Sequence, residues 1–208
     1  LLIVIEFLRR LKTTRTAQVS TLAAVLLMAA VLTYQRNRVW SNSVALWTDT
    51  VAKSPTKARP RFQLAYAYFE AGRCGDAVSQ YAQAATLEKP DYNLLIDWAL
   101  AADCAGGREQ AIAELRAAAA IERTAHVYSL IGMIFGEQGK AADSLDALAE
   151  ASSIDPRYEM TYVYRGNVYA SAGQFDKAAA EYSHALALNP SDQVARNGLA
   201  SAGRHLTR

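Results

Sequence analysis

Small and large apolar residues recur along this chain with a long, regular spacing. Four glycines, Gly72, Gly106, Gly139 and Gly173, lie 34, 33 and 34 residues apart. Each is followed five residues later by Ala or Ser, then after four residues by Tyr or Leu, and after three more by Ala. A period near 34 with this internal order predicts helix–turn–helix units that stack into an α-solenoid.

The last unit shows why this order suits paired helices. Tyr162, Gly166 and Tyr169 have the i, i+4, i+7 spacing that puts side chains on one face of a helix. Gly166 allows a second helix to approach closely, and Pro190 ends that second helix. The third unit repeats this order, whereas the first two units have alanine in place of the close-packing glycine. The chain is therefore predicted to contain four repeats over residues 57–192, a half-repeat helix within 37–56 and a capping helix over 193–208.

Composition supports an all-helical class. Hydrophobic residues make up 51% of the 208 residues, and no stretch alternates with the period of two that is typical of strands. Residues 1–40 carry six Lys or Arg and only Glu6, whereas residues 41–208 carry sixteen basic and nineteen acidic residues. Nucleic-acid binding requires a basic face. A mildly acidic repeat region is therefore not expected to bind nucleic acid.

An uncharged segment precedes the repeats, from Thr16 to Gln35. Twenty residues of helix rise by about 30 Å, which is the thickness of a bilayer core. Tyr34 and Trp40 follow the segment's apolar centre, as interfacial aromatic residues often do. We therefore expect residues 16–36 to form a transmembrane helix in contact with the lipid bilayer. A secretory signal peptide is the alternative, but bulky residues stand where its cleavage site needs small ones.

Residues 1–15 are apolar at first and then basic, ending in Arg9-Arg10-Leu-Lys12-Thr-Thr-Arg15. We expect them to hold the end of an earlier membrane helix and a cytoplasmic loop, within the C-terminal piece of a longer protein with several membrane spans. Basic loops stay in the cytoplasm. The repeats are therefore expected on the periplasmic or extracellular side of a membrane, such as a bacterial inner membrane.

Two cysteines, Cys74 and Cys104, lie near helix ends in neighbouring units. In a repeat stack the first helix of one unit packs on the second helix of the unit before it, with these ends adjacent. An oxidising compartment would therefore permit a disulfide. The alternative is two unrelated buried cysteines, because free Cys packs well as a small apolar residue. Their spacing fits no zinc site.

The order of residues in the last two units resembles the tetratricopeptide repeat, and the first two units resemble it less closely. A second resemblance covers roughly residues 17–192, and its distinctive part is the segment Arg36-Asn-Arg-Val-Trp40 followed by Leu46-Trp47. This segment is similar to the junction in dolichyl-phosphate-mannose-type glycosyltransferases that carry C-terminal tetratricopeptide repeats. That resemblance implies that this chain is an accessory, acceptor-binding domain of an enzyme. The catalytic acidic residues of such enzymes lie in loops upstream of the repeats. No catalytic residue is therefore carried over to this chain.

No residue pattern indicates catalysis, a cofactor or a metal. The three histidines, His126, His184 and His205, are scattered, and none forms an i, i+4 pair with another metal ligand or with Glu. We therefore expect a chain without enzymatic activity of its own and without a cofactor.

In tetratricopeptide repeats, set positions of each first helix point into a groove. Mapped onto this chain, they predict a partner-binding groove formed by Phe62, Tyr66, Phe69, Ile96, Leu100, Met133, Val163 and Asn167. The groove begins aromatic and apolar and becomes more polar, which fits an apolar or extended segment of a partner protein. Only Asn167 fits a carboxylate clamp, so recognition of a C-terminal carboxylate is not expected. The alternative is that the half-repeat helix or the membrane part covers these residues.

Three functions remain open on the sequence alone. The first is a membrane-anchored scaffold for protein–protein interaction, with a protein or peptide in a groove outside the cytoplasm. The second is the accessory domain of a membrane glycosyltransferase, and the third is a structural subunit that docks on other subunits of a membrane complex. The scaffold is preferred because its description holds in all three cases.

Overall fold

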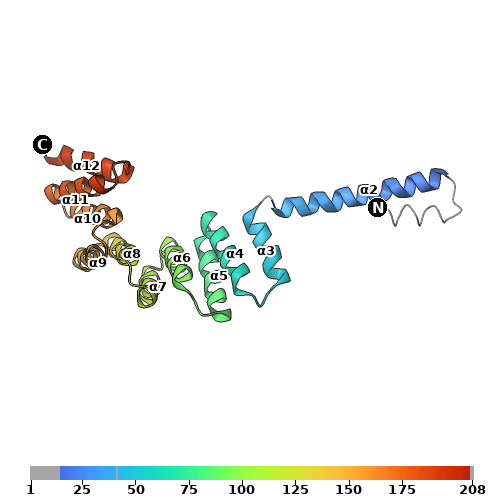
Figure 1. Ribbon diagram of the computed structural model, residues 1–208, viewed down its shortest axis with the longest axis horizontal. Helices are drawn as coiled ribbons and strands as arrows, with labels where there is room; N and C mark the ends of the chain where they lie inside the picture. The colour runs from blue at the N-terminus through green and yellow to red at the C-terminus, as the bar shows by residue number, and fades with distance from the viewer. Residues whose placement is uncertain (1–14, 41, 207–208) are drawn as a thin grey trace. The chain divides into compact units, whose positions relative to one another are not determined.

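The computed structural model describes residues 15–40 and 42–206, and all regular structure in these residues is α-helical. The chain divides into two compact units, Leu1–Pro55 and Thr56–Arg208. The first contains α2 (Arg15–Trp40) and α3 (Ser43–Lys53). The second contains the remaining helices, shown in Figure 1: α4 (Ala58–Glu70), α5 (Cys74–Leu87), α6 (Tyr92–Cys104), α7 (Arg108–Ile121), α8 (Ala125–Glu137), α9 (Ala141–Ile154), α10 (Glu159–Ser171), α11 (Phe175–Leu188) and α12 (Gln193–Leu206).

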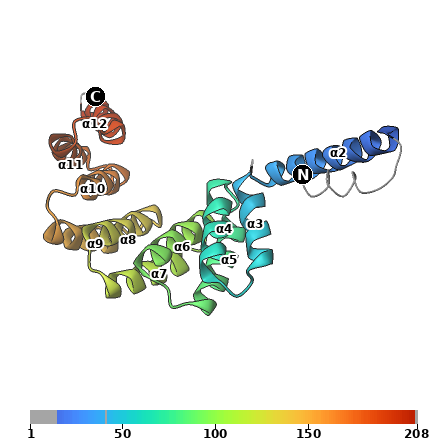
Figure 2. The ribbon, with the colours of Figure 1, turned by 45° about the vertical axis from the view of Figure 1, so that its right-hand side comes forward.

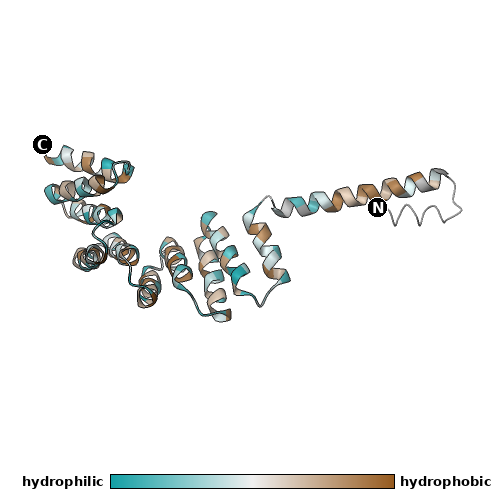
Figure 3. Ribbon diagram, viewed as in Figure 1, coloured by the Kyte–Doolittle hydropathy of each residue, from teal (hydrophilic) through white to brown (hydrophobic). Residues whose placement is uncertain are grey.

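The first unit corrects one expectation from the sequence. Among the described residues, no helix is both long enough and apolar enough to cross a membrane, so the transmembrane helix expected over 16–36 is not found. The uninterrupted apolar run of α2 is Leu22–Leu32, which Figure 3 shows as a brown stretch bounded by paler and teal residues. The membrane helix end and basic loop expected before it, over 1–14, lie outside the described residues.

The second unit confirms the predicted all-α solenoid. Each repeat is a pair of helices packed against each other, α4 with α5, α6 with α7, α8 with α9 and α10 with α11. Figure 2 shows the pairs α4–α5 and α10–α11 lying side by side. Each second helix also packs against the first helix of the next repeat, and α12 packs on α11. The buried apolar residues form clusters between these helices rather than one central core, as expected for stacked repeats.

The four periodic glycines end the first helices of the repeats. Gly72, Gly106, Gly139 and Gly173 have φ between 71° and 84°, and among the described residues no other has a positive φ. In the first repeat the amide of Arg73 donates to the carbonyl oxygen of Tyr68 at 2.8 Å. This bond across a left-handed glycine is the Schellman ending of a helix, which satisfies a carbonyl group that would otherwise lack a partner.

A second set of glycines brings the two helices of a repeat together. A Cβ atom added to Gly132 would lie 2.5 Å from Cγ of Leu148, and one added to Gly166 would lie 2.6 Å from Cε1 of Tyr182. Both distances are far below van der Waals contact, so only glycine fits. The large partner residues are almost completely buried, Leu148 at 0% and Tyr182 at 3% exposure.

We expect Gly132→Ala to destabilise the second unit by about 1–3 kcal/mol, because its Cβ would displace Leu148 and approach the backbone oxygen of Ser144 at 3.1 Å. The measurement is urea unfolding followed by circular dichroism. Gly75→Ala is the matched control, since a Cβ there would meet no atom within 4 Å. That variant is expected to be neutral or stabilising by up to about 1 kcal/mol. Equal stability of the two variants would contradict this account of helix packing.

Candidate functional site

A cleft of about 310 Å³ opens between α8 and α10, on the face formed by first helices. Two residues of the predicted groove, Met133 and Asn167, lie in its wall. The full lining is Met133, Gly136 and Glu137 from α8 and Tyr164, Asn167, Val168 and Ser171 from α10. The cleft therefore combines an apolar part, an amide, two hydroxyls and one carboxylate, which are the groups that bind a peptide.

The side chain of Asn167 is held in one orientation. The buried Tyr182 donates its hydroxyl hydrogen to Oδ1 of Asn167 at 2.7 Å. In the part of the chain that the structure describes, the Nδ2 group has no hydrogen-bond partner, and Asn167 is exposed. Because an amide nitrogen carries two donors, the cleft presents two hydrogen-bond donors at a fixed place.

The edge of the cleft is negatively charged. Glu137 is exposed, and its Oε2 lies 3.9 Å from Nη2 of Arg108. Arg108 also lies 3.7 Å from Asp103, so one arginine is shared between two carboxylates. Burial raises the pKa of the Tyr164 phenol, and the nearby Glu137 carboxylate raises it further. Tyr164 therefore remains a neutral hydroxyl, and the cleft disfavours an anionic ligand.

Hydrogen bonds between first helices fix the spacing of the repeats beside the cleft. The hydroxyls of Ser129 in α8 and Thr161 in α10 lie 2.8 Å apart, and both residues are fully buried. Nδ1 of His126 lies 2.8 Å from the hydroxyl of Tyr158. Buried polar groups of this kind must be paired, so these bonds hold α8 and the start of α10 at a fixed separation.

The other predicted groove residues lie elsewhere. Phe62 lines a separate cleft of about 410 Å³ near the starts of α4 and α6 and also packs edge-on against Tyr81. Tyr66 is 45% exposed and is available to a partner. Phe69 and Leu100 are partly buried and pack against the clusters of buried apolar residues.

Two predicted contacts need correction. Val163 is 0% exposed, so its side chain cannot contact a partner. Ile96 is 6% exposed and lines neither of the two clefts. Both belong to apolar clusters between helices. Conversely, the sequence analysis missed Tyr164, which lines the cleft. No signal separates Tyr164 from the packing tyrosines Tyr162 and Tyr169, because one sequence does not show which tyrosine faces the neighbouring repeat.

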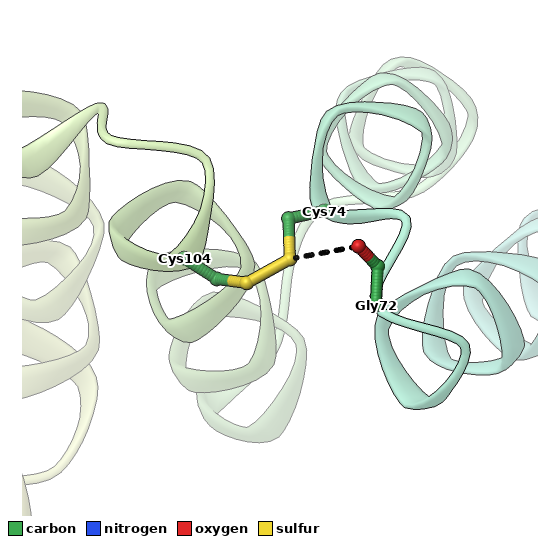
Figure 4. The surroundings of a disulfide bond; sticks show 3 residues. All are labelled: Gly72, Cys74 and Cys104. Atoms are coloured by element: carbon green, nitrogen blue, oxygen red, sulfur yellow. Dashed lines mark hydrogen bonds between the residues drawn. A yellow bond between two sulfur atoms is a disulfide. The ribbon is translucent and has the colours of Figure 1, made fainter.

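Cys74 and Cys104 form a disulfide between the first and second repeats (Figure 4). Their Cα atoms are 5.8 Å apart, and 30 residues separate them along the chain. The sulfur of Cys74 also contacts the carbonyl oxygen of Gly72 at 3.7 Å. The bridge joins the start of α5 to the end of α6, where the sequence had left open a bridge or two unrelated cysteines.

Among the described residues, no group of three or more His, Cys, Asp and Glu side chains could hold a metal ion. The three histidines make separate ring contacts. His126 meets Tyr158, His184 lies 3.9 Å from the ring centre of Tyr162, and His205 stacks on Phe175.

Comparison with known proteins agrees with this architecture. Residues 160–192, which include α10 and α11, match the family described as Tetratricopeptide repeat. The chain is a tetratricopeptide repeat protein. It is 29% identical over 73 residues to "Small glutamine-rich tetratricopeptide repeat-containing protein 2" from Mycosarcoma maydis. That match covers 35% of this chain and 21% of the relative, so the chain matches about a fifth of the relative's length.

Two solved structures share the fold. A thermophilic tetratricopeptide repeat protein of Thermus thermophilus has 20% identity and a TM-score of 0.65, covering 86% of this chain and 97% of its own. YrrB, described as a tetratricopeptide repeat protein with an unusual peptide-binding site, has 16% identity and a TM-score of 0.61, covering 82% and 86%. These matches support the tetratricopeptide part of the sequence resemblance and give no support to its glycosyltransferase part.

We expect His126 to make the stability of the solenoid depend on pH. Burial lowers the pKa of His126 below its ordinary value of 6.5. The unfolded chain therefore takes up a proton near pH 6.5, whereas the folded chain does so only at lower pH. The contribution of neutral His126 is present above pH 6.5 and is lost as the pH falls through the folded-state pKa.

The measurement is the difference in unfolding free energy between the wild type and His126→Gln, from urea titrations at pH 7.5 and pH 5. We expect this difference to favour the wild type more at pH 7.5. A difference that is the same at both pH values would contradict the assignment.

Proposed function

We propose that this chain is a protein–protein interaction scaffold that binds an extended segment of a partner protein in the cleft between α8 and α10. The observation that carries this proposal is the Asn167 amide, which Tyr182 orients toward the open cleft. An extended peptide has backbone carbonyl groups without partners, and two fixed amide donors match them. The proposed role is binding alone, because the groups that line this cleft are assigned to peptide contacts.

The remaining lining residues favour particular peptide side chains. Met133 and Val168 form the apolar part of the cleft, and methionine adapts to apolar side chains of different shape. Glu137 at the edge favours a Lys or Arg in the bound segment. The unusual peptide-binding site of YrrB, which shares this fold, supports peptide binding as the activity of the repeats.

We expect Asn167→Ala to weaken binding of a cleft-binding peptide by about tenfold, which corresponds to loss of one or two hydrogen bonds. Such a peptide is first selected on the wild-type protein from a random peptide library, and affinity is then measured by fluorescence anisotropy. Tyr182→Phe is the sharper test. Tyr182 is 3% exposed and cannot touch the peptide, so a several-fold loss would come only from the freed amide.

Asn197→Ala, an exposed asparagine of α12, is the control and should leave affinity unchanged. Circular dichroism of each variant verifies the fold. If folded Asn167→Ala and Tyr182→Phe variants bind selected peptides as well as the wild type does, the cleft is not the binding site.

We further propose that the repeats function outside the cytoplasm, in the periplasm or the extracellular space. The disulfide between Cys74 and Cys104 supports this location, because such bridges persist in oxidising compartments and are rare in the cytosol. Its position between two repeats also suits a structural bridge. It ties α5 to α6, which already pack against each other.

Thiol labelling of intact cells tests the location. With a membrane-impermeant maleimide, we expect no labelling of the chain before mild reduction and labelling of both cysteines after it. A variant with Cys74→Ser and Cys104→Ser controls for background. Labelling that requires opening of the membrane and is independent of reduction would contradict both the bridge and the location.

A further inference from the structure

A second concave surface lies on the other side of α8. Ile131 and Met133 are two residues apart, so their side chains leave the helix about 200° apart. Met133 lines the cleft described above, whereas Ile131 lines a groove of about 630 Å³ formed by α7, α8 and α9. The two openings therefore lie on opposite faces of one helix, and occupation of one leaves the other free.

The floor of this groove is apolar. Tyr128, Ile131 and Phe135 come from α8, at the i, i+3, i+7 spacing of a single helix face. Ile131 is 5% exposed, and the two aromatic rings are partly buried. The flanking helices contribute small side chains, Ala119 from α7 and Ala147 from α9. Because these side chains are short, they do not cover the two rings. Arg123 lies 6.0 Å from the centre of the Tyr128 ring, and Lys140 lies 5.7 Å from that of Phe135.

The wall formed by α9 is acidic. Asp143, Asp146 and Glu150 line the groove and share one face of the helix. Glu150 forms an ion pair with Arg123. Asp143 and Asp146 are exposed, and within the described residues neither forms an ion pair. The exposed Arg116 of α7 also lines the groove. The lining therefore holds three carboxylates and one arginine beside an apolar floor.

Repeat packing does not require these carboxylates. The residues at the same distances from the turn glycine are Lys177, Ala180 and His184 in α11. In α7 they are Gln110, Ala113 and Ala117. In α5 they are Asp76, Ser79 and Gln83. All four helices nevertheless occupy the same place in their repeats. The full set of three carboxylates is thus particular to the third repeat, and stacking of the helices does not explain it.

We propose that this groove binds a basic amphipathic segment of a partner protein. Its apolar side chains would lie on Tyr128 and Phe135, and its Lys or Arg side chains would face Asp143 and Asp146. Burial of the apolar side chains supplies affinity, and the carboxylates select the sign of the partner's charge and accelerate association. This site is independent of the cleft between α8 and α10, and it adds a second docking surface to the scaffold.

A synthetic amphipathic peptide tests the proposal. The probe is a fluorescein-labelled helical peptide of Leu, Lys and Ala with about four turns. Two comparison peptides have Glu in place of Lys, or Ser in place of Leu. We expect the wild-type chain to bind the first peptide more tightly than either comparison, with an affinity that falls as salt rises.

Protein variants then locate the site. Asp143→Asn together with Asp146→Asn should weaken binding of the Lys peptide by about fivefold, from the loss of two exposed charge pairs. Glu109→Gln together with Asp176→Asn is the matched control. It changes the net charge equally at exposed acidic residues in the first turns of α7 and α11, and it should leave affinity within about twofold. Ala120→Trp fills the groove from its exposed wall and should abolish binding.

Three results would overturn the proposal. The first is equal binding of the Lys and Glu peptides, and the second is equal weakening by the acidic-wall and control variants. The third is loss of Lys-peptide binding in Asn167→Ala, which would place the peptide in the other cleft. Conversely, if Asn167→Ala does not weaken binding of peptides selected for the cleft, that result contradicts the proposed function and leaves the groove proposal unaffected.

Discussion

The contact between a glycine on the first helix and a large residue on the second helix holds each of the last two repeats together. Gly132 lies against Leu148, and Gly166 lies against Tyr182, with no room for a Cβ atom between them. This contact fixes the separation of the two helices within a repeat. The first helix of the next repeat packs on the same second helix, so its position is fixed as well. The clefts between repeats are consequences of that spacing.

The same contact connects packing to recognition in the fourth repeat. The ring of Tyr182 fills the core, and its hydroxyl orients the exposed Asn167. The third repeat has Leu148 in place of Tyr182 and Met133 in place of Asn167. Leucine packs equally well but has no hydroxyl, and methionine needs no orientation. Of these two repeats, only the fourth therefore offers fixed amide donors, from Asn167. The third repeat offers the adaptable apolar side chain of Met133 beside them.

The repeat spacing predicted the helix pairs because glycine alone adopts the left-handed turn at Gly72 and its equivalents without strain. The groove positions of the tetratricopeptide resemblance predicted Met133 and Asn167, and both line the cleft. The same positions failed at Ile96 and Val163, which are buried by neighbouring helices. Helical period shows which face of a helix is apolar, but it does not show how closely the next repeat covers that face. For α2, the uncharged segment predicted a membrane span, and among the described residues no helix long and apolar enough to cross a membrane is found.

Both openings border α8 because small residues surround it. Gly136 lets α10 come near, with Val168 Cγ2 3.1 Å from the place of a Cβ atom, and the cleft lies beside this contact. On the opposite face, Ala119 and Ala147 leave the floor of the groove uncovered. The two surfaces differ in chemistry, since one offers oriented amide donors and the other offers carboxylates over aromatic rings. A partner segment that binds one surface is therefore not expected to compete for the other. With both proposed sites occupied, a single helix would bring two different chains together, which is the physical basis of the proposed scaffold.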